Sequence, residues 1–225
     1  IVHDYLDLLD TSAAVYEKNG DYAMGIFSSG WCQLMDAASR NRCNTDDNRE
    51  ALACGHWLCH ESCWSDAAKT AIESGEAVDI ACHGGLRLYT MPIWAGDEVI
   101  GAVNFGYGDP PRDQATLQEL ANQFEVSVDR LREEAEAYPS RPPYIIDLAK
   151  RRLAASARLI GEMVQRRENE VRVHHLNSLL GAIRNVNQII VQEADLRSLM
   201  QKACAAVLEA RSYEACAIAL LNDTT

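Results

Sequence analysis

The sequence predicts an α+β fold that continues into one long helix, and three observations lead to this prediction. Two β-prone runs surround Asn19-Gly20, and two more surround Ala95-Gly96-Asp97, so each pair carries the turn signal of a β-hairpin. Between these hairpins, apolar residues within 30–73 recur at helical spacing. From Tyr144 to about Gln192 the chain contains no proline, which permits an uninterrupted helix over that length.

The N-terminal elements follow from local turn and cap signals. Residues 13–27, AAVYEKNGDYAMGIF, predict the first hairpin, because Asn and Gly tolerate the positive φ angles of a two-residue turn. Residues 30–73 predict a group of helices, and the polar run Asp46-Asp47-Asn48 is typical of a helix N-cap. Gly75 is expected to end the last helix of this group.

Residues 77–107 predict three further strands, AVDIAC, LRLYTMPIW and EVIGAVNFGYG, of which the last two form the second hairpin. Pro92 has no N–H for a sheet ladder, so it is expected at an edge or a bulge. Two strands, then helices, then three strands is the order of PAS- and GAF-like sensor folds. We therefore expect an antiparallel sheet with inserted helices that cups a ligand on one face.

A long helix follows two short ones. Residues 113–137 predict two helices divided near Ser127, and prolines up to Pro143 separate them from the long helix. The long helix would extend roughly 70 Å and would not stay folded alone in water. Its apolar residues alternate three and four apart, as in a coiled-coil seam, with a polar stretch at 165–170. The seam contains Ile146, Ala149, Leu153, Ser156, Ile160 and Met163 before this stretch, and Leu176, Leu180, Ile183, Asn187 and Ile190 after it. We predict a parallel homodimer through residues 144–192.

The C-terminal part predicts one more helix, starting at Asp195, and a strand over residues 213–222. One helix and one strand cannot form a core, so we expect the start of a second domain there. The predicted organisation is a sensory domain over residues 1–141, a signalling helix over 142–192 and the start of a further domain over 193–225. The chain does not begin with Met, and we expect it to be part of a longer protein with an output domain.

The composition excludes several classes of partner. The formal net charge of the 225 residues is −12, whereas nucleic acids and anionic membranes need a basic face. The apolar runs are shorter than the ~20 residues of a membrane span, and the first ten residues do not resemble a signal peptide. We therefore expect a cytoplasmic protein that binds neither nucleic acid nor membrane. Six of the eight cysteines lie between Cys32 and Cys82, and in a reducing compartment such clusters bind metals, respond to redox state or are buried.

Three motifs occur in order along the first part of the chain: WLCHESCW, then CHGGLRLYTMPI, then GAVNFGYGDPPRD. Together they resemble the PocR-type ligand-binding domain, over about residues 5–168. This domain is found at the N-terminus of bacterial multidomain histidine kinases and diguanylate-cyclase regulators. The resemblance implies a sensory module for small organic molecules or hydrocarbon derivatives, with no reaction of its own, so we expect no enzyme activity. The tail from LLGAIRNV to ACAIALL is similar to the opening helix and first strand of a GAF domain.

The cysteine cluster predicts a metal site. Cys59 and Cys63 are four residues apart, so a helix would place both thiols on one face. Cys32 follows the first hairpin and Cys82 ends the third strand, and these two elements would face each other across a PAS-like cup. Four thiolates from three elements suit tetrahedral zinc or an iron–sulfur cluster.

Other interpretations of the cysteines remain open. Cys43 and Cys54 are a second set of possible ligands, and the resemblance implies that simpler PocR domains lack these two cysteines and Cys59. Buried structural thiols are one alternative, and a redox switch or a thiol-based redox enzyme that uses Cys59 and Cys63 is another. Aromatic and polar residues near the predicted sheet are candidates for binding a small ligand. They are Phe27, Trp31, His83, Tyr89, Asn104 and Tyr107.

Overall fold

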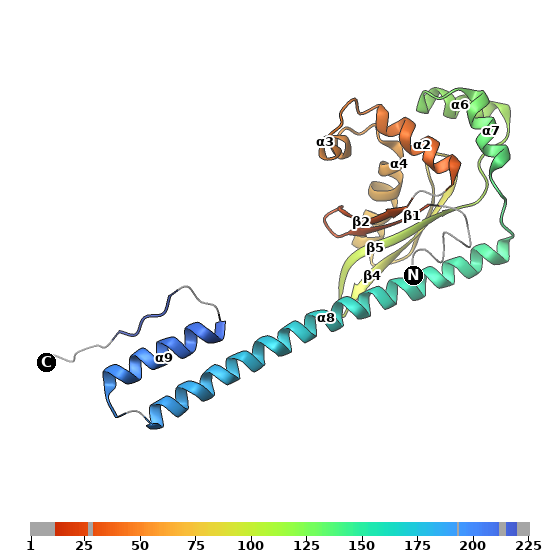
Figure 1. The fold of residues 1–225 in the computed structure, drawn as a ribbon. Helices are drawn as coiled ribbons and strands as arrows, with labels where there is room; N and C mark the ends of the chain where they lie inside the picture. Colours follow the sequence, from red (N-terminus) through yellow and green to blue (C-terminus); the bar gives the residue numbers. More distant parts are fainter. Residues whose placement is uncertain (1–11, 27–28, 193, 212–214, 220–225) are drawn as a thin grey trace. The chain divides into compact units, whose positions relative to one another are not determined.

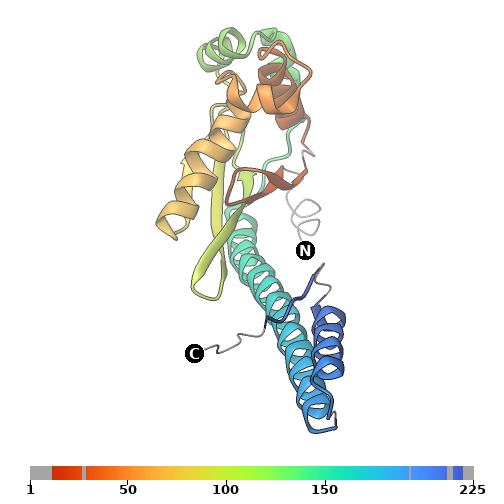
Figure 2. The same cartoon turned by 90° about the vertical axis from the view of Figure 1, so that its left-hand side faces the viewer.

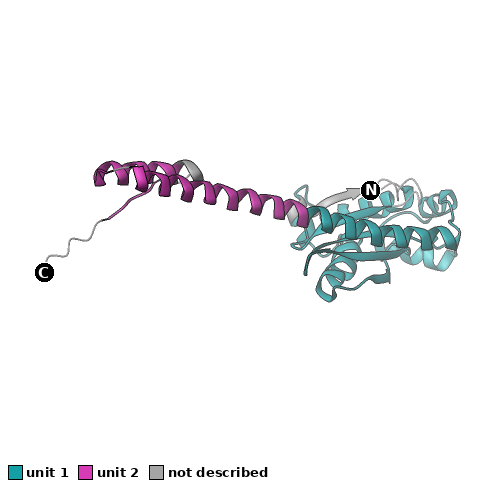
Figure 3. Ribbon diagram, turned by 90° about the horizontal axis from the view of Figure 1, so that it is seen from below, with its two compact units in different colours: residues 1–164 teal, residues 165–225 magenta. Residues whose placement is uncertain are grey.

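The structure is a computed structural model that describes residues 12–26, 29–192, 194–211 and 215–219. The chain divides into two compact units, residues 1–164 and 165–225 (Figure 3). The boundary lies within a single helix, α8 (Pro143–Gln192), at the start of the polar stretch 165–170. Each unit is described by itself below.

The first unit contains a five-stranded antiparallel sheet with the strand order β2-β1-β5-β4-β3 (Figure 1). The strands are β1 (Ala13–Glu17), β2 (Tyr22–Ile26), β3 (Val78–Ala81), β4 (Arg87–Ala95) and β5 (Glu98–Tyr107). Both predicted hairpins are present, β1–β2 and β4–β5. In the first turn Gly20 has a φ of 94°, and the Asn19 side chain accepts a hydrogen bond from the Asp21 amide at 2.9 Å. The predicted α+β class, with helices inserted after the second strand, is confirmed.

Pro92 lies in β4, which has neighbours on both sides, yet it is accommodated as predicted. Only residues 87–90 of β4 pair with β3, so Pro92 lies beyond the end of that ladder. On the other side Pro92 pairs with Ala102 of β5, and a register shift follows between Ile93 and Trp94. The missing N–H of Pro92 therefore leaves no gap in the sheet.

Helices occupy the segment between β2 and β3, as the apolar spacing predicts. They are α2 (Gly30–Asn41), α3 (Asn48–Ala53), α4 (Leu58–His60), η1 (Glu61–Ala68) and α5 (Lys69–Ser74). Ser29 caps α2 by accepting a hydrogen bond from the Cys32 amide, and Gly75 ends α5 in the left-handed region with a φ of 70°. The element η1 is a π-helix, a rare form often found at functional sites, and the sequence did not predict it. After the sheet come α6 (Gln114–Phe124) and α7 (Val128–Ala137), with Ser127 capping α7.

The two faces of the sheet have different covers (Figures 1 and 2). Helices α2, α4, η1 and α5 lie over one face, and the first part of α8 lies along the other. Alternation along β5 separates the faces: Ala102 packs with η1 and α5, whereas Val103 and Phe105 pack with Ala149 and Leu153 of α8.

This packing corrects part of the coiled-coil prediction. Ala149, Leu153 and Ser156 are buried, and the first two pack on the chain's own sheet rather than on a second chain. Ile160 also packs against this core, whereas Met163 is 60% exposed, so the predicted seam matches the packed face of the helix in part. The dimer prediction is thereby limited to the part of α8 beyond residue 164.

The second unit contains the rest of α8 and α9 (Leu196–Arg211), which runs alongside it in Figures 1 and 2. Asp195 caps α9, as predicted, by accepting a hydrogen bond from the Ser198 amide at 2.8 Å. The strand predicted over residues 213–222 is absent from its described part, residues 215–219, and the rest lies outside the described residues. Among the described residues, no helix combines the length and apolar character that crossing a membrane requires.

Candidate functional site

The four predicted cysteines Cys32, Cys59, Cys63 and Cys82 line one cavity of about 50 Å³ between the helices and the sheet. Each is a free thiol. The other residues of the wall are small, aliphatic or uncharged polar: Ser12, Ala13, Ala14, Ser62, Gly84, Leu86, Leu88, Asn104 and Gly106. Among the described residues, the wall therefore contains four sulfur atoms and no carboxylate or ammonium group.

Four separate elements bring the thiols together. Cys32 lies in the first turn of α2, Cys59 in α4, Cys63 in η1, and Cys82 directly after β3. Around the cavity, Cys32, Cys59 and Cys82 pack against a core centred on Trp31 and Leu117. Cys63 instead packs against a second small core that contains Tyr16 and Ala68. The cavity thus lies where two parts of the hydrophobic core meet.

Burial keeps all four thiols protonated. It raises the pKa of Cys82 to about 11 and the pKa of Cys32 above its ordinary value, although the nearby Ser12 and Ser29 act to lower the pKa of Cys32. For Cys59 and Cys63, burial raises the pKa well above the ordinary range, and neighbouring thiols of the cluster raise it further. A neutral dithiol or tetrathiol of this kind must lose protons before it binds a metal ion.

The donor set fits a thiophilic metal, although the thiols are not arranged as a closed coordination shell. Among the described residues, no group of three or more His, Cys, Asp or Glu side chains is placed to hold a metal ion. Sulfur donors from several elements are nevertheless the set that zinc and iron–sulfur clusters use. Binding would require the four side chains, which share one wall, to turn toward a common point.

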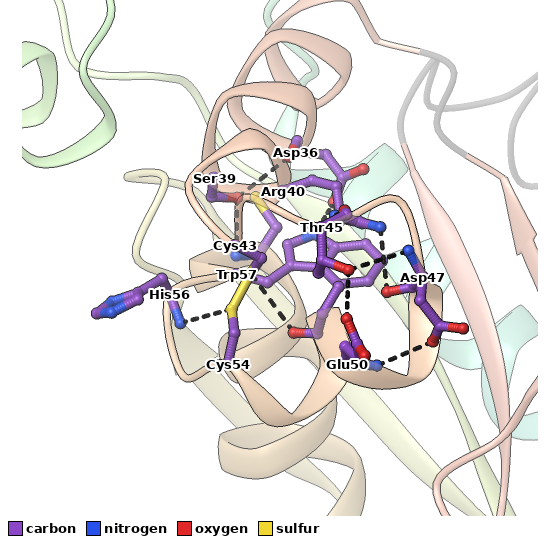
Figure 4. Close-up of a disulfide and its surroundings, with 12 residues drawn as sticks. Asp36, Ser39, Arg40, Cys43, Thr45, Asp47, Glu50, Cys54, His56 and Trp57 are labelled. Atoms are coloured by element: carbon purple, nitrogen blue, oxygen red, sulfur yellow. Dashed lines mark hydrogen bonds between the residues drawn. A yellow bond between two sulfur atoms is a disulfide. The ribbon is translucent and has the colours of Figure 1, made fainter.

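The remaining two cysteines of the cluster, Cys43 and Cys54, form a disulfide with a Cα–Cα distance of 5.7 Å (Figure 4). They do not line the cavity, so the structure separates this second set from the first. A bonded pair has no thiolate to offer a metal ion.

The structure assigns the candidate ligand-binding residues to several places. Asn104 lines the cavity, where its side chain accepts a hydrogen bond from the Ala14 amide and donates one to the Cys63 carbonyl. Tyr89 and Tyr107 instead lie on the α8 side of the sheet, because they follow the register of Phe105 rather than that of Asn104. They are therefore not among the residues that line this cavity.

Two further candidates support the cavity from outside. Trp31 is buried in the core, and its indole N–H donates to the Gly84 carbonyl at 2.9 Å. His83 is exposed, and its Nδ1 lies 2.6 Å from the Ser62 hydroxyl, which also accepts a hydrogen bond from the His83 amide. Phe27 lies outside the described residues.

A polar cluster that the sequence did not predict joins the sheet to α8. The carboxylate of Asp79 on β3 accepts hydrogen bonds from Arg87, from the Tyr107 hydroxyl and from Lys150 of α8, at 2.7, 2.6 and 2.6 Å. The Lys150 ammonium also lies 4.3 Å from the ring centre of Tyr107 and 4.9 Å from that of Tyr89. Burial acts to raise the pKa of Asp79, but its hydrogen bonds and the Lys150 charge outweigh this and hold the pKa below its usual range.

Comparison with known proteins gives one match. A family model described as the sensory domain found in PocR matches residues 1–165. No curated protein and no solved structure matches the chain.

Proposed function

The chain belongs to the family of sensory domains found in PocR, and from this premise we propose that the four-thiol cavity is its sensory site. The site binds a thiophilic metal, either zinc or an iron–sulfur cluster. One observation carries this proposal: Cys32, Cys59, Cys63 and Cys82 come from separate elements and line one wall. Thiols that serve only as small apolar core residues have no reason to converge on a shared cavity.

A small organic ligand is the second candidate, because much of the cavity wall is aliphatic. Ala13, Ala14, Leu86 and Leu88 contribute methyl groups, and Asn104 contributes a polar group. A volume of about 50 Å³ admits only a molecule of a few heavy atoms. The metal proposal is favoured because it uses the four sulfur atoms, which an aliphatic ligand does not need.

The route by which binding reaches α8 passes through the turn of residues 82–86. On the cavity side this turn carries Cys82 and is held by the hydrogen bonds to Trp31 and Ser62. Its two strands carry Asp79 and Arg87, and the Asp79 carboxylate accepts hydrogen bonds from both Arg87 and Lys150 of α8. A movement of Cys82 toward a bound ion would therefore change the contacts of α8. The ligand shifts this equilibrium only through its different affinity for the two positions of the turn.

Beyond residue 164 the seam of α8 is free to pair with a second copy of the chain. Leu176, Leu180, Ile183 and Ile190 are all about half exposed, and they continue the a/d spacing with Asn187 as a polar position. We expect this segment to form a parallel homodimer that passes the state of the cavity to an output domain in the full-length protein.

The test is the metal content and absorbance spectrum of protein purified without oxygen, followed by zinc titration. We expect stoichiometric metal that is lost in the variant Cys59→Ser/Cys63→Ser, whereas the control Cys204→Ser/Cys216→Ser keeps it. Apparent zinc affinity should rise with pH, because binding displaces thiol protons. Folded protein that is colourless, metal-free and unable to bind zinc would refute the metal proposal. A shift in melting temperature with short alcohols or diols would then support the organic ligand.

A further inference from the structure

The Cys43–Cys54 disulfide differs in its surroundings from the four thiols of the cavity. Both of its cysteines are partly exposed, and they lie in the connections that follow α2 and α3 (Figure 4). The backbone amide of His56 donates a hydrogen bond to Cys54 Sγ at 3.3 Å. A reductant in solution can therefore reach this bond.

The disulfide joins the connections that follow α2 and α3, close in sequence to two of the helices that carry cavity thiols. Cys43 follows α2, the helix that contains Cys32, and Cys54 lies five residues before Cys59 of α4. Between the disulfide and the cavity, α2 and the chain before α4 are joined by three contacts. The Trp57 indole donates to Asp36 at 2.7 Å, the Arg40 guanidinium lies 5.3 Å from the Trp57 ring centre, and the Cys59 amide donates to Ser39 at 3.5 Å.

The loop closed by the disulfide is otherwise held mainly by local polar contacts. Arg40 donates to the Thr45 carbonyl at 2.7 Å, Thr45 donates to the Glu50 carboxylate at 2.6 Å, and the Glu50 amide donates to Asp47 at 3.1 Å. Figure 4 shows these side chains gathered around the disulfide. Exposed polar contacts contribute little to stability, so the covalent bond adds a constraint to this loop beyond the burial of Ala51.

We propose that the Cys43–Cys54 disulfide is a redox-responsive clasp, and that its reduction by a dithiol opens the four-thiol cavity. A thiolate of the dithiol attacks Cys43 Sγ and forms a mixed disulfide, while Cys54 leaves as a thiolate that the His56 amide stabilises. The second thiol of the reductant then displaces Cys43 and closes its own disulfide. Two electrons and two protons pass from the dithiol to the pair. The biological meaning of the clasp rests on the proposed function, because it controls entry to that site.

The test measures access to the cavity and needs no bound metal. In the Cys204→Ser/Cys216→Ser background, the rate of iodoacetamide labelling at each remaining cysteine is followed by peptide mass spectrometry, before and after dithiothreitol treatment. We expect the oxidised protein to label slowly at Cys32, Cys59, Cys63 and Cys82, and reduction to raise these rates at least tenfold. Adding Cys43→Ser/Cys54→Ser should give the fast rates without any reductant, and circular dichroism checks that this variant remains folded.

Two results would overturn the clasp. One is labelling of the cavity thiols at equal rates in the oxidised, reduced and substituted proteins. The other is free thiols at both Cys43 and Cys54 in protein kept under oxidising conditions. Neither result depends on zinc. If the protein fails to bind zinc but its labelling responds to dithiothreitol, the clasp is supported and the metal proposal is refuted. If the protein binds zinc but its labelling does not respond to dithiothreitol, only the clasp is refuted.

Discussion

The two parts of α8 have the same apolar spacing and opposite environments. Before residue 165 the helix buries Ala149, Leu153 and Ala157 against the sheet of its own chain. After residue 170 its apolar residues Leu176, Leu180 and others are about half exposed. The polar stretch 165–170 coincides with the boundary between the two compact units.

The difference shows that spacing identifies a packing face but not what packs on it. The size of the residues on that face indicates which kind of partner packs on it. The first part presents Ala149, Ser156 and Gly161 to its partner, and small residues let a helix approach a sheet closely. The second part presents the larger Leu and Ile side chains that fill a helix–helix seam.

The largest expected effect is the contrast between Leu153→Ala and Leu180→Ala. The Leu153 side chain is 0% exposed and that of Leu180 is 53% exposed. Removing a buried leucine side chain costs about 2–5 kcal/mol, whereas removing an exposed one costs less than about 0.5 kcal/mol in the fold of one chain. All four tryptophans lie in the first unit, so denaturant unfolding followed by tryptophan fluorescence measures its stability. Equal losses in the two variants would refute the division of α8.

Dimerisation should depend on Leu180 in the second part of α8, whereas the stability of the first unit should not. We expect Leu180→Asp to weaken the dimer by at least about 100-fold, or about 2.7 kcal/mol, because it places a charge in the seam. The tryptophan-monitored stability of the first unit should stay unchanged. Light scattering over a range of protein concentrations gives the dissociation constant. A wild-type protein that remains monomeric at every concentration would end the dimer proposal.

Sequence reasoning was most reliable where local chemistry decides the structure. Asn19-Gly20 and Gly75 marked their turn and helix end, and Ser127 marked the division between α6 and α7. Convergence of the four cavity cysteines also followed from the order of the elements. The order of the elements does not show which face of the sheet α8 covers. For this reason Tyr89 and Tyr107 were assigned to the ligand side.

Two features were missed for different reasons. Asp79 and Lys150 are 71 residues apart, and neither belongs to a local motif. Cys43 and Cys54 are only 11 residues apart, but the spacing of cysteines does not determine their connectivity. In the structure Tyr89, Phe105 and Tyr107 share one face of the sheet, and an aromatic face opposite the cysteine face could have suggested a second helix cover.

The two glycines of α8 should respond in opposite directions to alanine. A Cβ at Gly161 would collide with the Trp94 carbonyl, where α8 meets the β4–β5 hairpin, whereas a Cβ at Gly181 meets nothing within 4 Å. We expect Gly161→Ala to cost about 1–3 kcal/mol, because a backbone carbonyl cannot move aside easily. Gly181→Ala should gain up to about 1 kcal/mol from helix propensity. Unfolding followed by circular dichroism measures both, and a gain at Gly161 would mean that α8 does not approach the hairpin this closely.

The smallest effect concerns Lys150, the polar link between α8 and the sheet. Because the pKa of Asp79 is lower in the folded protein than in the unfolded chain, the link stabilises the fold above the ordinary carboxyl pKa, about 3.9. This contribution is lost as the pH falls through the lower, folded-state pKa. We expect Lys150→Met to cost less than about 1 kcal/mol at pH 7, since the pair is partly exposed, and to reduce the loss of stability on acidification. Lys69→Met, which removes an exposed 4.0 Å pair with Glu73, is the matched control and should behave like wild type. Identical stability profiles for Lys150→Met and wild type between pH 7 and pH 3 would show that Lys150 does not hold α8 to the sheet.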